Sequence, residues 1–259
     1  MTNSYLLPIL IKSRLTYHKK NAKGFTLLEV LVVVLIVGIL ATTASVSWLS
    51  FVNRQRVNGV QNAALRAIEA AQLEAKSRQL SYSVSFRVTY IDKPDIQGYF
   101  PQYAIHTTNR LNYTGDDPNE KLLNPNDTSQ LSEENWKSLG EGLDIKGNQV
   151  LMCTNLAVHD PPNTTGNNQL DANTTCKPSD LAKARTITFD DRGTLSGDEL
   201  NLDTDANGDG TPDGLPITLA EASGDYTDGQ PISSSKRCVK LITLLGATTT
   251  AQGDACPSS

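Results

Sequence analysis

The stretch Gly24-Phe25-Thr26-Leu27-Leu28-Glu29-Val30 decides the architecture of this chain, because it joins a basic leader to a long apolar segment. The leader, residues 1–24, holds no acidic residue and five basic ones, Lys12, Arg14, Lys19, Lys20 and Lys23. No charged residue lies between Glu29 and Arg54. About 24 uncharged residues at a rise of roughly 1.5 Å each form a helix that can cross the hydrocarbon core of a bilayer. The sequence therefore predicts a membrane-spanning helix, and the positive-inside rule keeps the leader on the cytoplasmic face.

The small residue of this junction lies before the apolar segment. A secretory signal peptide carries its small-residue cleavage site after the apolar region. Gly24 directly follows Lys23, so cleavage after this glycine leaves the anchor on the mature chain. Glu29 is unusual, because a carboxylate near the end of a membrane helix costs several kcal/mol unless it finds a partner or reaches the interface. It is either an ordinary anchor residue that reaches the headgroups or a functional charge.

The run Lys23-Gly24-Phe25-Thr26-Leu27-Leu28-Glu29, followed by an apolar helix with Gly38, resembles the class III signal of type IV pilins and type II secretion pseudopilins. The resemblance implies that a prepilin peptidase cuts after Gly24 and methylates the new amino terminus of Phe25. It also implies that Glu29 pairs with such an amino terminus during filament assembly. Residues 25–53 would then form the transmembrane and assembly half of the N-terminal helix.

Composition describes an acidic, loop-rich protein beyond the leader. Residues 25–259 keep all 28 acidic residues and, without the five of the leader, 18 of the 23 basic ones, so their formal charge is about −10. Such a charge repels nucleic acid in general. Residues 81–259 suffice for one extracytoplasmic domain with its own core. Stretches rich in Asn, Asp, Thr and Gly predict a small core and large loops.

All four cysteines lie beyond the apolar segment, in the part that the predicted topology places in an oxidising compartment: Cys153, Cys176, Cys238 and Cys256. Disulfides are therefore expected. One of the three pairings, Cys153 with Cys176 and Cys238 with Cys256, closes two short loops, but the sequence alone does not fix the connectivity. The rival interpretation, a zinc site, lacks any Cys-x-x-Cys pair and any histidine at ligand spacing.

The segment after the apolar run predicts an amphipathic helix over residues 54–80, because apolar residues recur at steps of three and four: Val57, Val60, Ala64, Ala67, Ile68, Ala71 and Ala75. Its mostly alanine stripe permits close approach of a sheet. Alternating or apolar runs predict six strands: residues 82–88, 99–107, 150–152, 186–189, 215–219 and 238–245. Residues 109–135 and 160–183 predict long polar loops. We expect an α+β fold in which the long N-terminal helix packs on one antiparallel β-sheet, as in pilins.

Three short blocks, residues 136–143, 187–195 and 239–246, are similar to the GspH and FimT branch of minor pilins. Some FimT-like proteins bind DNA through a Gly-Arg-x-Arg stretch, and the corresponding place here reads Gly246-Ala247-Thr248-Thr249, without either arginine. A basic cluster, Lys236, Arg237 and Lys240, remains beside Cys238. In so acidic a domain we expect it to be a solvated strand face, and nucleic acid is not an expected partner.

The segment 203–213 places oxygen-bearing side chains at alternate positions around a glycine, as calcium loops do: Asp203, Asp205, Asn207, Asp209 and Asp213. The twelfth position is Gly214 instead of a bidentate glutamate, which excludes an ordinary EF-hand. The pattern resembles the calcium loops of thrombospondin-type repeats. A structural calcium ion is one interpretation, and a plain solvated loop is the other.

No catalytic signature is present: the motifs Gly-x-Ser-x-Gly and His-Glu-x-x-His are absent, and no other cofactor is indicated. The resemblance implies a structural subunit instead of an enzyme. Its first implied function is that of a minor type IV pilin, anchored by one span in the bacterial cytoplasmic membrane and then incorporated in a pilus. Its partners would be prepilin peptidase, other pilins and the inner-membrane assembly platform. The alternatives are a type II secretion pseudopilin, or a DNA-uptake receptor or adhesin tip.

Overall fold

The computed structural model describes residues 24–107, 131–158, 168–196, 200, 202 and 213–257. The chain divides into two compact units at the boundary between Trp48 and Leu49. Helix α1, Leu27–Arg78, runs through this boundary, so its first half belongs to one unit and its second half to the other.

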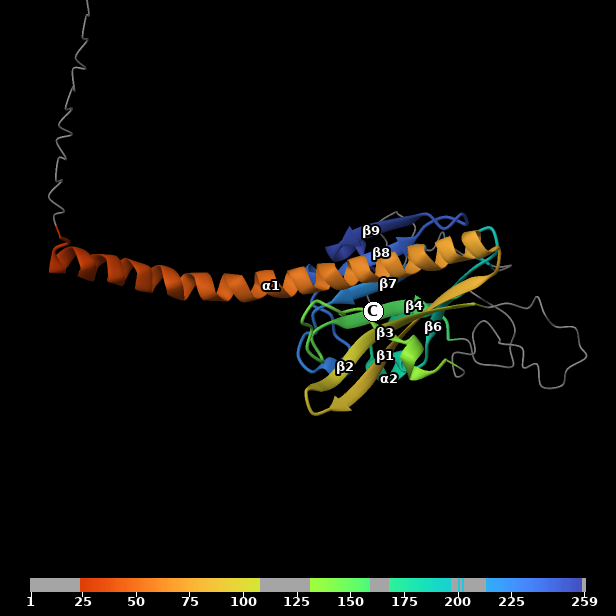
Figure 1. The fold of residues 1–259 in the computed structure, drawn as a ribbon, viewed down its shortest axis with the longest axis horizontal. Helices are drawn as coiled ribbons and strands as arrows, with labels where there is room; N and C mark the ends of the chain where they lie inside the picture. Colours follow the sequence, from red (N-terminus) through yellow and green to blue (C-terminus); the bar gives the residue numbers. More distant parts are fainter. Residues whose placement is uncertain are drawn as a thin grey trace, which may run out of the picture. The chain divides into compact units, whose positions relative to one another are not determined.

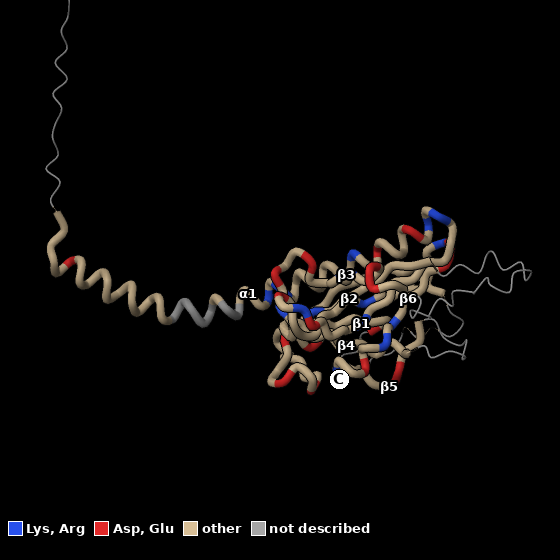
Figure 2. The backbone as a smooth tube through the Cα atoms, turned by 60° about the horizontal axis from the view of Figure 1, so that its bottom comes forward, with Lys and Arg blue, Asp and Glu red and all other residues tan. Residues whose placement is uncertain are grey.

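The first half of α1 exposes its apolar side chains. Thr26 opens the helix, because its Oγ1 accepts a hydrogen bond from the Glu29 backbone N–H at 3.1 Å. The large apolar side chains between Leu27 and Leu40 are 45% to 85% exposed. Glu29 is the only charged residue of this stretch, which is tan in Figure 2 apart from a red position near its start. Within the described part of the chain, no helix is both long enough and apolar enough to cross a membrane.

The second half of α1 forms one wall of the core. All seven residues of the predicted stripe are at most 3% exposed: Val57, Val60, Ala64, Ala67, Ile68, Ala71 and Ala75. Two glutamines fix the helix to neighbouring strand ends and turns. The amide of Gln61 donates to the carbonyl of Cys238 at 2.8 Å, and the amide of Gln72 donates to those of Gly193 and Leu245, each at 2.8 Å. The buried face of the helix contains the residues of the expected stripe, and the helix ends at Arg78.

The strands form two antiparallel sheets (Figure 1). The four-stranded sheet has the order β3-β2-β1-β6, with β1 at Tyr82–Lys93, β2 at Ile96–Thr107, β3 at Lys137–Ser138 and β6 at Arg185–Phe189. The five-stranded sheet has the order β5-β4-β7-β8-β9, with β4 at Leu151–Leu156, β5 at Leu170–Thr175, β7 at Leu215–Ala220, β8 at Arg237–Leu241 and β9 at Thr248–Gln252. The α+β class is thus confirmed, but the prediction of a single six-stranded sheet is wrong.

Each sheet contributes one face to a common core with α1. Val84, Phe86 and Ile187 come from the four-stranded sheet. Leu151, Ile217 and Val239 come from the five-stranded sheet, and all six side chains are fully buried. An isolated bridge between Val158 and Arg185 connects the end of β4 to β6. The second half of α1 therefore covers a core that two sheets share.

Several local predictions need correction. The segment 160–183 was expected to be a polar loop, yet its described part contains β5 and the short helix α2, Pro178–Leu181. β8 ends at Leu241 instead of continuing to Leu245, because the N–H of Gly246 donates to the carbonyl of Thr243 at 2.9 Å and closes a turn. Of the loop predicted over 109–135, residues 109–130 lie outside the described residues. Its end contains the single 3-10 turn η2, Glu133–Asn135.

The alanine stripe predicts that a larger side chain destabilises the domain at a buried alanine but not at a neighbouring alanine beside a cavity. Ala71 is 0% exposed within the core, whereas its neighbour Ala70 lines an open cavity of about 390 Å³. We expect Ala71→Leu to lower the free energy of unfolding by about 1–3 kcal/mol, because extra methylene groups overpack a filled site. The matched variant Ala70→Leu should change it by less than about 0.5 kcal/mol. Urea unfolding of the full chain in detergent measures both, and equal effects would contradict the close approach of helix and sheets.

Candidate functional site

The peptide bond between Gly24 and Phe25 lies outside regular structure. α1 begins only at Leu27, and the side chain of Phe25 is 80% exposed. A Cβ added to Gly24 would meet no atom within 4 Å. An exposed peptide bond outside regular structure, at a small residue, is accessible to a protease. The two predicted processing residues are therefore adjacent to the helix start but not part of it.

Glu29 occupies the first turn of α1, where the helix dipole favours a negative charge. Its side chain is exposed, and among the described residues no cation lies within ion-pair distance of it. In water this carboxylate is solvated. In an apolar surrounding it requires a cation, because an isolated buried charge is strongly unfavourable. The residue can therefore receive an amino group once the helix is surrounded by apolar material.

The four cysteines form two disulfides, Cys153–Cys176 and Cys238–Cys256, as the sequence led us to expect. The connectivity, which the sequence left open, is the local one. The first bond joins β4 to the residue that follows β5, and the second joins β8 to the residue that follows the short turn η5, Gly253–Ala255. Each bond fixes a chain segment that otherwise contributes few core residues.

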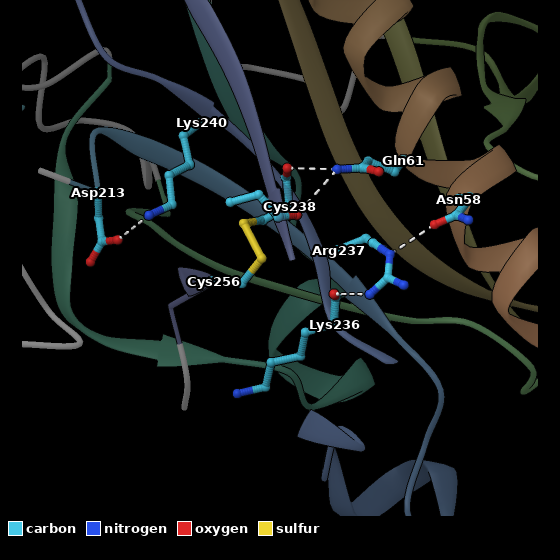
Figure 3. The surroundings of a disulfide bond; sticks show 9 residues. Asn58, Gln61, Asp213, Lys236, Arg237, Cys238, Lys240 and Cys256 are labelled. Carbon is cyan, nitrogen blue, oxygen red and sulfur yellow. Dashed lines mark hydrogen bonds and ion pairs between the residues drawn. A yellow bond between two sulfur atoms is a disulfide. The ribbon is translucent and has the colours of Figure 1, made fainter. Parts of the chain in front are cut away.

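The second disulfide lies beside the α1 contact (Figure 3). Cys238 accepts the hydrogen bond from Gln61 through its carbonyl, and Arg237 Nε donates to Asn58 Oδ1 at 2.8 Å. β8 is thus bonded to α1 through its backbone and through a side chain. Through the disulfide, Cys256 in the C-terminal segment is covalently joined to the strand that is bonded to α1.

The prediction that Lys236, Arg237 and Lys240 form a solvated face is wrong. Lys236 and Lys240 are each only 4% exposed, and Arg237 is half-buried. Lys240 belongs to β8, which pairs with β7 along one edge and with β9 along the other. Burial lowers the pKa of the Lys236 ammonium, while the carboxylate of Asp254 raises it. The sequence could not reveal this burial, because clustered basic residues are usually exposed.

Lys240 forms a buried ion pair with Asp213. Its Nζ donates to Asp213 Oδ1 at 2.6 Å, and the two side chains are 5% and 0% exposed (Figure 3). Asp213 was predicted to be a calcium ligand, and here its carboxylate already contacts a cation. The other four predicted ligands, Asp203, Asp205, Asn207 and Asp209, lie outside the described residues. Among the residues that are described, no group of three or more His, Cys, Asp or Glu could hold a metal ion.

The sequence did not indicate a small polar pocket beside the second half of α1. This cavity of about 200 Å³ is lined by five polar side chains, Asn53, Arg56, Asn148, Gln149 and Glu221, together with Val150 and Ala222. We call it the charged pocket. Its members come from three distant parts of the chain, so no local motif could have identified it.

The buried ion pair allows a stability prediction. Asp213→Asn retains the size of the side chain but leaves the Lys240 ammonium without its anionic partner. We expect a loss of about 3–5 kcal/mol in the free energy of unfolding, as for other broken buried pairs. The exposed control Asp191→Asn should lie within about 0.5 kcal/mol of wild type.

Denaturant unfolding of the full chain in detergent measures these values. Combining Asp213→Asn with Lys240→Met should recover part of the loss, since the unpaired charge is removed as well. If Asp213→Asn alone unfolds like wild type, the pair is not the anchor that the geometry indicates.

Comparison with known proteins gives one match. Residues 19–45 match the family model of the prokaryotic N-terminal methylation motif, which is the class III prepilin signal of type IV pilins. Searches of curated proteins and of solved structures each found no match. The motif implies processing by a prepilin peptidase and assembly with other pilins. At residues 19–45 this chain is therefore similar to the prepilin signal of type IV pilins and pseudopilins.

Proposed function

We propose that the protein is a minor type IV pilin of the GspH/FimT-like kind, a structural subunit that enters a pilus through α1. The observation that carries the proposal is the junction itself: an accessible Gly24-Phe25 bond, then Glu29 as the only charge before Arg54. Subunits with this motif are structural components, and the acidic domain with two disulfides supports a minor rather than a bulk role.

Residues 25–53 serve twice in this proposal. They first anchor the subunit in the bacterial cytoplasmic membrane by a single span, with the domain of residues 81–259 outside the cytoplasm. They then leave the bilayer and pack against the same helices of neighbouring subunits, assisted by the assembly platform. The exposure of the apolar side chains between Leu27 and Leu40 supports this, because such a surface requires apolar cover. Gly38 has no atom within 4 Å of an added Cβ, so another helix can approach closely there.

Glu29→Ala should block incorporation without unfolding the domain. Loss of a desolvated ion pair worth at least about 1.4 kcal/mol lowers incorporation about tenfold or more. Immunoblots of sheared filaments measure the effect. The exposed control Glu134→Ala should appear in filaments at the wild-type level. Equal amounts of Glu29→Ala and wild type would contradict the proposed role.

Gly24→Val should accumulate as the uncut precursor in the membrane fraction, since the bulky side chain replaces the small residue at the cleavage point. Mass spectrometry of the N-terminus measures cleavage and the methylation of Phe25.

Deletion of the gene distinguishes a type IV pilus subunit from a type II secretion subunit. Loss of surface pili supports the minor pilin, whereas loss of protein secretion with normal pili supports a type II secretion pseudopilin.

A structural calcium ion in the segment 203–213 remains a prediction. A ligand that binds only the native state raises the melting temperature. Titration of the full chain in detergent with calcium should therefore shift the melting curve upward, and magnesium should do so less. An unchanged melting curve at millimolar calcium would show that the native protein does not bind calcium.

A further inference from the structure

The charged pocket contains a cation and an anion that do not pair with each other. Asn53 lies between them: its Oδ1 accepts from Arg56 Nη1 at 3.4 Å, and its Nδ2 donates to Glu221 Oε2 at 3.4 Å. Both contacts are long for hydrogen bonds. Arg56 also approaches Asp144 at 4.0 Å, but the Asp144 side chain is 95% exposed. The guanidinium and the Glu221 carboxylate therefore retain most of their capacity to bind a ligand.

Two amides of the same pocket are oriented by the backbone. Asn148 Oδ1 accepts from the N–H of Tyr99 at 2.8 Å, and Gln149 Oε1 accepts from the N–H of Lys146 at 2.9 Å. The carbonyl oxygens are thus engaged, and the NH₂ groups remain as donors. Together with Arg56 they form a set of donors that suits an anion rich in oxygen, such as a phosphate.

The pocket requires a ligand that carries both charges. A phosphate satisfies Arg56 and the amides but would be repelled by Glu221 unless a cation accompanies it. Quaternary ammonium groups are recognised by aromatic cages. The seven lining residues include no aromatic side chain, so a primary ammonium, which donates hydrogen bonds to a carboxylate, fits better. A volume of about 200 Å³ is below the roughly 300–1,000 Å³ of pockets for drug-sized ligands, so it admits a headgroup but not acyl chains.

The position of the pocket along α1 indicates where such a ligand would come from. Trp48 and Phe51, which are 68% and 52% exposed, lie shortly before Arg54, the first charged residue after Glu29. Aromatic side chains followed by basic residues mark the interface between bilayer and water. Asn53 and Arg56 lie within about two turns of this point. They are thus at headgroup depth when the preceding segment is in the membrane.

We propose that the charged pocket binds the phosphoethanolamine headgroup of a membrane phospholipid. The phosphate contacts Arg56 and the amides of Asn148 and Gln149, and the ammonium contacts Glu221. The inference rests on the proposed function only in requiring a membrane-anchored stage. A bound lipid holds the domain against the membrane surface until the subunit leaves for a filament.

Calorimetric titration tests the proposal on the full processed chain in maltoside detergent. The probes are dihexanoyl phosphatidylethanolamine, phosphatidylglycerol and phosphatidylcholine, which have equal chains and different headgroups. The ethanolamine lipid should bind about tenfold more tightly than the others, as the loss of one charge-assisted contact implies. Glycerophosphoethanolamine without acyl chains should compete for the site, and inorganic phosphate should not. Equal affinities, or a preference for phosphatidylglycerol, would overturn the proposal.

Two variants test which residue contacts the ammonium and which contacts the phosphate of the headgroup. Glu221→Gln should reduce the affinity for the ethanolamine lipid to that for phosphatidylglycerol, and Arg56→Gln should weaken both. The control Glu69→Gln removes an exposed carboxylate of α1 outside the pocket and should bind as wild type does. A Glu221→Gln protein that keeps its preference for ethanolamine refutes the assignment. None of these measurements requires a filament. If the protein assembles into filaments normally but shows no headgroup preference, the lipid site is refuted and the proposed pilin function is not affected.

Discussion

The first half of α1 carries an apolar surface that the described part of its own chain does not cover. Apolar area left in water costs about 25 cal/mol per Å², so this surface selects an apolar environment. Within such an environment Glu29 is the one group that still requires a specific partner. A stretch of apolar side chains favours association in general, and a carboxylate at a fixed position within it would favour one register, because leaving it unpaired is costly. The length of the apolar run and the place of Glu29 therefore act together.

The second half of α1 has the opposite task of holding a compact domain. Its stripe is mostly alanine, which brings the helix backbone close to both sheets. Close approach leaves backbone carbonyls near the helix, and two glutamines satisfy them: Gln61 at β8 and Gln72 at the turns near Gly193 and Leu245. The helix is thus attached by apolar burial along its length and by hydrogen bonds at two points. The Cys238–Cys256 bond extends this attachment to the C-terminal segment.

The helix and the hairpin of β1 and β2 could be predicted from the sequence because their signals are local and periodic. The division into two sheets could not. β5 and β9 read Leu-Asp-Ala-Asn-Thr-Thr and Thr-Thr-Thr-Ala-Gln, which have the polar composition of loops, and their strand state depends on pairing with β4 and β8. Lys240 was misjudged for a related reason. Its buried side chain is paired with Asp213, which lies 27 residues away in sequence.

A cation and an anion are arranged differently in two places of this domain. Lys240 and Asp213 touch directly and are almost completely buried, so removing either partner would leave the other as an uncompensated buried charge. Arg56 and Glu221 are kept apart by Asn53 at the edge of an open cavity. Direct pairing would neutralise this second set, and the intervening amide prevents it while leaving both charges partly solvated. A pocket with separated opposite charges is stabilised most by a ligand whose own charges are separated in the reverse order. The zwitterionic phosphoethanolamine headgroup proposed above as the ligand has this arrangement.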